Sequence, residues 1–442
     1  MKIEISNHGK WQLSLTLKLV ILAFMGLVLL IPLEMVKSVI LERQGNAERV
    51  KKEISTQWAG EQCISGPVLN LPVRYLPAGK DEKPFISIWH ILPESLDITV
   101  SLAPEQRYRG IYKSVVYSSA IRLTGSYSIP GLNSDEKNEI LWQDAYYTIG
   151  VSDNRGLKGD LVLKTDSSEL KAEPGVIDSD ISASGVSFRS PLAPDTKKVS
   201  FSADLNLSGS ETLRMIPLGK ITKTSVKSTW SSPSFTGSFL PSKREVTESG
   251  FSAEWEVTHL NRNFPQAWSG KAYDPSESAY GVQLFLPVDH YQKSWRSARY
   301  GILFIALTFL VLIFLEVTRK ENIHILNYFL VSLALILFFS LLNALSEHTG
   351  FSIAYLLSSA ATITMITLFT ARLFRAGRTA LTVAGMLIVL YSFIFVLLTL
   401  NDYALLAGNV GLFILLAVIM RLASKLGLSE NNPPVDPGQH GL

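Results

Sequence analysis

The sequence is poor in cysteine and in charge. Cys63 is the only cysteine among 442 residues, so no disulfide can form within the chain. An oxidising compartment is therefore allowed but leaves no mark in the sequence. Charged residues make up 18% of the chain and the formal net charge is +3, which is too small to indicate a nucleic acid or a strongly acidic partner. We expect no nucleic acid among the partners of this protein.

Recognisable catalytic motifs are also lacking. The sequence contains no Gly-x-Ser-x-Gly nucleophile elbow, no His-Glu-x-x-His zinc helix and no Gly-x-x-x-x-Gly-Lys phosphate loop. The histidines His90, His259 and His290 are widely spaced and have no cysteine nearby, so ordinary half-buried histidines are favoured over a metal site. The sequence therefore predicts no catalytic residues, no metal, no cofactor and a protein that is not an enzyme.

Long apolar runs, by contrast, are abundant. Five of them follow one another between residues 298 and 422 without a single proline, and each is long enough to cross about 30 Å of hydrocarbon as a helix. We expect these spans at 298–318, 324–345, 351–371, 380–400 and 404–421. An earlier run ends in Glu34 to Lys37 rather than in the small residues of a signal-peptide cleavage site, so we interpret residues 19–37 as an uncleaved anchor helix. The sequence thus predicts six transmembrane helices, one before and five after a long central region.

Lysine and arginine are distributed unevenly between the loops. The loops at 346–350 and 401–403 contain neither, whereas the other connections and ends carry Arg319, Lys320, Arg372, Arg375, Arg378, Arg421 and Lys425. Because cytoplasmic loops concentrate basic residues, we expect both termini in the cytoplasm. Residues 1–18 are then a cytoplasmic N-terminus, residues 38–297 lie in the periplasm, and residues 423–442 form a disordered cytoplasmic tail.

The central region shows two successive patterns. From residue 38 to about residue 59 the pattern is charged and compatible with a helix, which predicts that the anchor helix continues out of the membrane. From residue 66 to residue 290 apolar and polar residues alternate with period two, for example from Leu96 to Leu102, and turn-forming clusters separate the runs. Such alternation is typical of antiparallel sheets with one buried face. We expect a mainly β domain of one or two sandwich-like subdomains.

Polar residues between two of the spans are a candidate site. The sequence predicts a five-residue outer hairpin made of Ser346, Glu347, His348, Thr349 and Gly350. A carboxylate and an imidazole side by side at the membrane edge could bind a proton, a metal ion or a lipid headgroup, or they could be solvated at an ordinary turn. The sequence leaves both interpretations open.

A transporter mechanism finds little support in the spans themselves. Alternating access is usually built on inverted repeats or on helices that glycine and proline break at mid-membrane. The five clustered spans contain no proline, which argues against such a mechanism. Glu34 and Glu316 lie near span ends, where their side chains are expected to reach water.

Several segments of the sequence resemble those of the CreD family, whose members are bacterial inner membrane proteins associated with cell envelope integrity. The segments extend over nearly the whole chain and include Leu29 to Pro32, Ser152 to Gly156, Leu205 to Gly209, Pro233 to Phe251 and Ala344 to Phe351. The main departures are Glu34 in the anchor and a longer proline-rich tail. Some residues in the segments have no known role, namely Asp153, Arg155, Gly156, Lys243, Arg244, Glu245 and Glu248. The resemblance implies an inner membrane location and a link to envelope stress responses, but no catalytic residue that could be carried over.

These observations lead to one expected function and one alternative. We expect an inner membrane protein that contributes to envelope integrity and stress tolerance without catalysis, by binding an envelope component or a partner protein through its periplasmic domain, with membrane lipid around its helices. The alternative is a transporter or lipid-handling protein that works through Glu347 and His348. An isolated fragment of residues 38–297 should retain ligand binding only in the first case.

Overall fold

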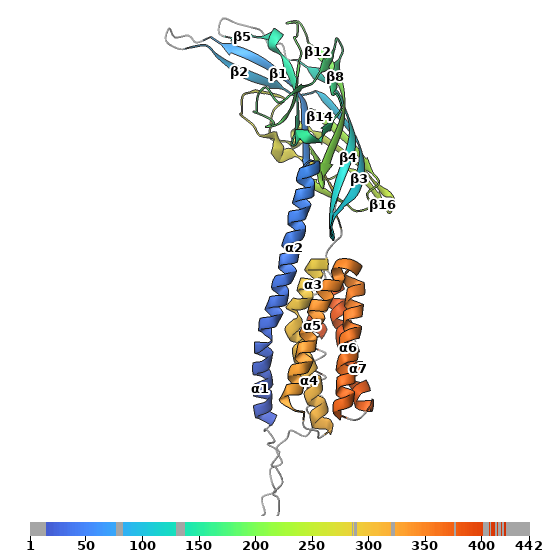
Figure 1. The fold of residues 1–442 in the computed structure, drawn as a ribbon. Coiled ribbons are helices and arrows are strands. Elements are labelled where there is room, and N and C mark those ends of the chain that lie inside the picture. The colour runs from blue at the N-terminus through green and yellow to red at the C-terminus, as the bar shows by residue number, and fades with distance from the viewer. Residues whose placement is uncertain are drawn as a thin grey trace, which may run out of the picture. The chain divides into compact units, whose positions relative to one another are not determined.

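The chain divides into two compact units. The computed structural model describes residues 15–76, 83–129, 138–284, 286, 290–319, 323–374 and 377–400, with scattered residues between 406 and 420. A helical unit comprises Met1–Asn46 and Val288–Leu442, and a β unit comprises Ala47–Pro287 (Figure 1). The β unit is therefore inserted in the sequence between the first apolar helix and the others.

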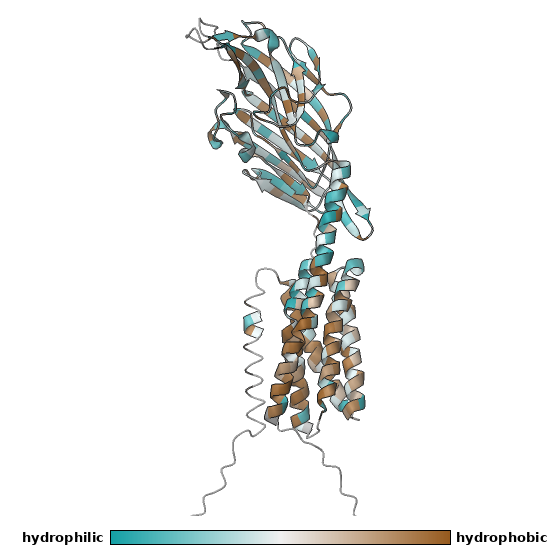
Figure 2. Cartoon of the chain, turned by 60° about the vertical axis from the view of Figure 1, so that its left-hand side comes forward, coloured by the Kyte–Doolittle hydropathy of each residue, from teal (hydrophilic) through white to brown (hydrophobic). Residues whose placement is uncertain are grey.

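The helical unit consists of long apolar helices. Within the described residues the α-helices of the chain are α1 (Leu15–Val28), α2 (Leu30–Trp58), α3 (His290–Arg299), α4 (Gly301–Arg319), α5 (Ile325–Thr349), α6 (Phe351–Phe374) and α7 (Gly377–Thr399). In the described part of the chain, five stretches are long and apolar enough to cross a membrane, namely Leu17–Trp58 and the main parts of α4 to α7. Figure 2 shows hydrophobic residues covering α4 to α7, as lipid-facing helices require.

The expected architecture, with apolar helices before and after a large mainly β region, is confirmed. Helix α2 continues to Trp58, in line with the charged helical pattern that follows the anchor. The expected span at 404–421 and the two expected cytoplasmic ends, 1–18 and 423–442, lie largely outside the described residues.

The prediction of a five-residue hairpin at 346–350 is wrong. Ser346 to Thr349 form the last turn of α5, and only Gly350 stands between α5 and α6. The backbone N–H of Gly350 donates to the carbonyl of Ser346 at 3.2 Å, and Gly350 has a φ of 79°, a left-handed value that favours glycine at a helix C-terminus. The change from apolar to polar residues marks the end of the apolar span, while the helix itself continues for one more turn.

The expectation that Glu316 reaches water is also wrong. Its side chain is 13% exposed and forms an ion pair with Lys18, whose side chain is 6% exposed. The hydroxyl of Tyr328 donates to Glu316 Oε2 at 2.7 Å, and Lys18 also donates to the carbonyl of Ile323 at 2.5 Å. Two opposite charges that neutralise each other can remain buried where a single one could not. Glu34 has a 65% exposed side chain paired with Lys37 at 2.6 Å, as its position near a span end predicts.

Two sheets build the β unit. The ten-stranded sheet runs in the order β10-β11-β6-β1-β13-β19-β15, with β2 and β5 also paired to β1, and β18 paired to β2. Its strands are β1 (Gln62–Tyr75), β2 (Phe85–Ile91), β5 (Asn138–Ile140), β6 (Tyr146–Val151), β10 (Glu173–Pro174), β11 (Gly185–Arg189), β13 (Thr212–Met215), β15 (Pro233–Gly237), β18 (Ala267–Ser269) and β19 (Tyr280–Leu284). The nine-stranded sheet runs β16-β17-β14-β3-β4-β12-β8-β9, with β7 paired to β12. Its strands are β3 (Ser95–Arg109), β4 (Tyr112–Ser128), β7 (Leu157–Lys158), β8 (Val162–Thr165), β9 (Glu169–Lys171), β12 (Lys198–Ser210), β14 (Ile221–Ser228), β16 (Lys243–Thr247) and β17 (Gly250–Thr258).

A single hydrophobic core joins the two sheets. Period-two alternation buries every second residue along parts of β3, β4 and β12, the long neighbouring strands of the nine-stranded sheet, namely over 96–102, 117–123 and 199–207. Tyr127 of that sheet packs its ring against Tyr147 of the other sheet, with 5.6 Å between ring centroids, and Trp255 packs against Tyr280 at 5.7 Å. Because residues of both sheets belong to one cluster, the β unit is one sandwich-like body rather than two subdomains.

Candidate functional site

Asp153 and Arg155 hold the end of helix α2. Arg155 Nη1 donates to the carbonyl of Thr56 in the last turn of α2 at 2.7 Å, and its Nη2 donates to Asp153 Oδ2 at 2.6 Å. The other carboxylate oxygen, Oδ1, accepts from the backbone N–H of Arg155 at 3.1 Å, and Oδ2 also accepts from the N–H of Gly60 at 3.0 Å. The last carbonyls of a helix have no partner within it, so a guanidinium in this place stabilises the helix end.

Asp153, Arg155 and Gly156 form a clamp on the end of helix α2, which charge and close packing both stabilise. The guanidinium of Arg155 holds the pKa of Asp153 well below its usual range, so the carboxylate stays ionised. Gly156 lies where a Cβ atom would be 2.2 Å from the carbonyl oxygen of Ser208, so no larger residue fits without a shift. Gln62 Nε2 donates to the carbonyls of Asp153 and Ser208, both at 3.0 Å. The family-like residues of this turn therefore have a structural role.

Further contacts fix the outer turns of α2 to the strands of the β unit. They are the ion pairs of Lys51 with Glu211 at 2.8 Å and of Glu53 with Arg109 at 2.7 Å, and the hydrogen bond from Trp58 Nε1 to the carbonyl of Tyr117 at 3.3 Å. The partners belong to three different strands or turns of the β unit. The end of the helix that follows the first span is thus an integral part of the β unit.

Lys243, Arg244 and Glu245 lie on an exposed edge strand. They belong to β16, which forms one edge of the nine-stranded sheet and whose residues are all exposed. Glu248, in the turn that follows, is exposed as well. Lys243 Nζ lies 3.5 Å from Glu254 Oε2, whereas the other three side chains form no ion pair or hydrogen bond with the described residues. In contrast to the clamp residues, these charges make no buried contact with the described residues, and the one ion pair among them, from Lys243 to Glu254, is exposed on both sides.

The residues predicted as a membrane-edge hairpin separate into buried and exposed ones. Ser346 is buried, and the Glu347 side chain is only 9% exposed, with Oε1 at 3.9 Å from Arg43 Nε of helix α2. That oxygen accepts no hydrogen bond from the described residues. His348 is exposed, so the structure does not bring it together with Glu347 in one site. The burial of Glu347 argues against a solvated turn at that residue, while a solvated position for His348 stays a prediction.

Cys63 offers no chemistry. Burial raises the pKa of its thiol to about 11, although Arg214 nearby lowers it. The thiol is therefore protonated at neutral pH, and thiolate is the form that attacks substrates or binds metals.

A row of polar and aromatic residues crosses the ten-stranded sheet. Asn70 on β1 lies directly opposite His90 on β2 and Tyr146 on β6, and Trp268 on β18 lies opposite His90. Directly opposed residues of antiparallel strands share one face of the sheet. The segment between β10 and β11 brings Asp178 and Asp180 to this face.

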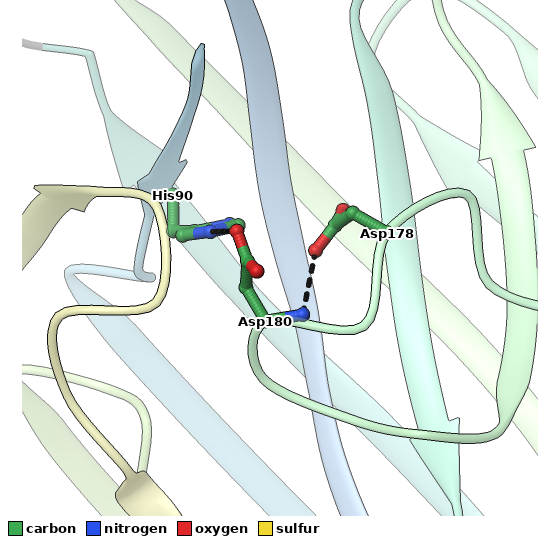
Figure 3. A group of neighbouring side chains, drawn as sticks. All are labelled: His90, Asp178 and Asp180. Carbon is green, nitrogen blue, oxygen red and sulfur yellow. Dashed lines mark hydrogen bonds and ion pairs between the residues drawn. The ribbon is translucent and has the colours of Figure 1, made fainter.

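His90, Asp178 and Asp180 form a compact cluster on that face (Figure 3). One ligand atom from each of them, an imidazole nitrogen or a carboxylate oxygen, lies within 4.8 Å of the other two. His90 is fully buried, and its Nε2 is 3.2 Å from Asp180 Oδ2, whose side chain is 26% exposed. The backbone N–H of Asp180 donates to Asp178 Oδ1 at 3.1 Å.

Neighbouring residues orient the cluster from the sheet side. Asn70 Oδ1 is 2.7 Å from His90 Nδ1, and the hydroxyl of Tyr146 donates to Asp178 Oδ2 at 2.5 Å. Burial and the bond to Asp178 both raise the pKa of Tyr146, so its hydroxyl remains a donor. A small cavity beside the cluster is lined by Asp178 and Asn70, with Ser65, Thr148 and Ser182 among the other lining residues.

Sequence reasoning missed this cluster. It treated His90 as an ordinary half-buried histidine and considered only other histidines and cysteines as partners. Asp180 lies 90 residues after His90 in the sequence, and Asp178 lies just before it. Both aspartates belong to a segment that has no alternating or helical pattern of apolar residues. The weak signals were the pair of aspartates in Asp178-Ser179-Asp180 and the polar Asn70 between the buried Leu69 and Leu71.

Fold and comparisons together identify the kind of protein. The fold defines a multi-pass membrane protein with a large β unit inserted between its first and second apolar helices. The family model described as "Inner membrane protein CreD" matches residues 14–428. The chain is also 32% identical over 406 residues to Inner membrane protein CreD of Escherichia coli (strain K12), an alignment that covers 89% of each chain. The chain belongs to the CreD family of inner membrane proteins, which confirms the resemblance seen in its sequence.

Proposed function

We propose that this protein contributes to the integrity of the cell envelope as a membrane-anchored binding protein. In this proposal the β unit lies in the periplasm and binds an envelope component or a partner protein without catalysis, while the apolar helices hold it in the inner membrane. The basic residues at the C-terminal ends of α4 and α6 and at the start of α7 support a cytoplasmic position for these three helix ends, because cytoplasmic loops concentrate lysine and arginine.

The observation that carries the proposal is the exposed edge strand β16. Its outer side has no partner strand among the described residues, so its backbone N–H and C=O groups on that side are available. An extended segment of another molecule can add to such an edge as a further strand, and charged side chains along the edge then select the partner. Lys243, Arg244 and Glu245 supply these charges with exposed side chains, of which only Lys243 has an ion-pair partner among the described residues.

A second candidate function rests on Glu347. A carboxylate side chain that is 9% exposed, with one oxygen that accepts no hydrogen bond from the described residues, is unusual at a membrane edge and favours a role in handling a proton or a lipid headgroup. The nearby Arg43 reduces the need for such a role, because it supplies an opposite charge at 3.9 Å.

Complementation tests the proposed function. A strain that lacks its own CreD and is sensitised to envelope stress would receive the full chain with Lys243→Glu and Arg244→Glu. The matched control carries Lys223→Glu and Lys227→Glu, which change the same charge at exposed positions of the interior strand β14. We expect the edge variant to lose protection and the control to keep it at equal membrane levels. Full protection by the edge variant would contradict binding at β16.

The orientation needs a test of its own. Cys63 would be replaced by serine, and single cysteines would be introduced at exposed positions, as Ser249→Cys in the β unit or Arg378→Cys at the start of α7. In intact cells, a maleimide that passes the outer membrane but not the inner one should label the first variant and spare the second. The opposite labelling pattern would contradict a periplasmic β unit.

A further inference from the structure

We propose that His90, Asp178 and Asp180 bind a divalent transition-metal ion on the outer face of the ten-stranded sheet. The inference concerns the β unit alone and holds whichever surface of the protein contacts a partner. Three observations carry it: the converging ligand atoms, the hydrogen bonds that orient them, and the chemistry of the donors.

The hydrogen bonds of Asn70 determine which nitrogen of His90 carries a proton. Asn70 Nδ2 is 3.3 Å from the carbonyl of Val68 and 2.9 Å from Thr148 Oγ1. A carbonyl can only accept, so the amide NH₂ points there and the amide oxygen faces His90 Nδ1. His90 Nδ1 must therefore be the donor in its 2.7 Å contact with Asn70.

This assignment leaves two acceptors facing each other. In a neutral imidazole that is protonated at Nδ1, Nε2 carries a lone pair, and here it is directed at a carboxylate oxygen of Asp180 at 3.2 Å. Such a pair needs either a proton between its atoms, on the ring or on the carboxyl group, or a metal ion. A histidine that donates its other N–H to a protein oxygen is the usual arrangement of metal-bound histidine.

The two aspartates are placed in the same way. Tyr146 and the backbone N–H of Asp180 occupy opposite oxygens of Asp178 and hold its carboxylate plane beside the cluster. Bonds from zinc to nitrogen and oxygen ligands are about 2.0–2.2 Å long, so two ligand atoms on one ion lie about 3–4 Å apart. The contact between His90 and Asp180 already has this spacing, and the limit of 4.8 Å for the whole set requires only a small inward movement of Asp178.

The donor set indicates which ions fit. One imidazole and two carboxylates suit Zn²⁺ and related transition-metal ions, whereas Mg²⁺ and Ca²⁺ prefer oxygen ligands alone. Three protein ligands leave at least one coordination position for water or for a donor of a bound molecule. Of the three proposed ligands, Asp178 also lines the small cavity, together with Asn70 and Ser182.

Zinc binding to the purified full chain in detergent tests this inference. The protein would be stripped of metal with a chelator and dialysed against buffered Zn²⁺, and bound zinc would be measured by mass spectrometry. The variants are Asp178→Asn and Asp180→Asn, because these half-buried side chains can be changed with less risk to folding than the fully buried His90. Asp160→Asn, at an exposed loop position, is the matched control. Circular dichroism would verify that each variant is folded.

We expect about one Zn²⁺ per chain in the wild type and in Asp160→Asn, and an affinity lowered at least about tenfold in each cluster variant. With Co²⁺ as a spectroscopic probe, visible absorption bands should appear in the wild type and vanish in the cluster variants. If the wild type binds no zinc at micromolar free Zn²⁺, the positive charge between His90 and Asp180 is a proton and the inference fails. Equal zinc affinity in all variants would place the ion elsewhere and would overturn it as well.

Discussion

The helical unit and the β unit bury ionisable side chains in different ways. In the helical unit, Lys18 and Glu316 pair with each other, and Tyr328 occupies the second oxygen of Glu316. In the β unit, His90 and two partly exposed aspartates direct ligand atoms at one another. The first arrangement is complete in itself, whereas the second needs a proton or a metal ion between His90 and Asp180. The comparison teaches that buried charge alone does not mark a functional site, because the number of positive charges relative to negative ones decides whether a ligand is needed.

The same contrast applies to the family-like residues. Asp153, Arg155 and Gly156 form the clamp on helix α2 and are occupied by contacts within the fold. Lys243, Arg244 and Glu245 are exposed on a free sheet edge. Residues of the first kind should affect stability, and residues of the second kind should affect function at unchanged stability.

The largest effect is expected from breaking the buried ion pair. Lys18→Met leaves the Glu316 carboxylate without a cation and should lower the free energy of unfolding by about 3–5 kcal/mol. Lys18→Met with Glu316→Leu should recover most of that loss, because no unpaired charge remains. Denaturation of the purified protein in detergent would measure both. A single variant as stable as the wild type would show that the pair is solvated rather than buried.

The clamp on helix α2 should matter less, but measurably. Asp153→Asn weakens charge-assisted hydrogen bonds and should lower the stability of the β unit by about 2 kcal/mol. Asp204→Asn is a control, because the ion pair of Asp204 with Arg122 is more than 60% exposed on both sides and should contribute far less to stability than the clamp does. Equal effects of the two substitutions would contradict a structural role for the clamp.

The clamp also predicts a pH dependence. The folded pKa of Asp153 lies below its unfolded value of about 3.9, so its contribution is fully present above about pH 5 and is lost as the pH falls towards the folded pKa. The stability difference between the wild type and Asp153→Asn should thus be constant from about pH 5 to 7 and shrink below pH 4. A difference that shrinks between pH 7 and 5 would show that another group controls the clamp.

Asn70, which accepts a hydrogen bond from the proposed metal ligand His90, should affect zinc binding without contacting the ion itself. Asn70→Leu removes the acceptor for His90 Nδ1 and should lower zinc affinity about tenfold, or about 1.4 kcal/mol, whereas Asn70→Asp should retain binding. Zinc titration of folded variants would measure this. Unchanged affinity in Asn70→Leu would mean that Asn70 does not orient the imidazole.

The smallest effect on stability is expected at the sheet edge. Lys243→Glu with Arg244→Glu changes only exposed side chains and should alter the unfolding free energy by no more than about 0.5 kcal/mol. Thermal unfolding in detergent would test this. A larger loss would assign these residues to the fold and would weaken the proposal that they contact a partner.

Local patterns in the sequence predicted the parts of the fold that depend on them. Apolar runs located the spans from α4 to α7, and alternation from Leu96 to Leu102 predicted the buried face of β3. Contacts between distant segments were not predictable in this way. Lys18 and Glu316 are 298 residues apart, and His90 and Asp180 are 90 residues apart on segments that share no periodic pattern. At Ser346 to Thr349, polarity was mistaken for a loop because a helix end at a membrane edge has the same composition.

The central claim is that function resides in the β unit, and one comparison tests it directly. Glu347→Gln and the edge variant with Lys243→Glu and Arg244→Glu would be expressed at equal membrane levels in the sensitised strain that lacks its own CreD. Survival of the Glu347→Gln strain under envelope stress should match that of the wild type. Survival of the edge-variant strain should fall to that of the deletion strain that carries no copy of the protein. Loss of protection with Glu347→Gln, together with full protection by the edge variant, would contradict the claim and place the function at the membrane edge of α5.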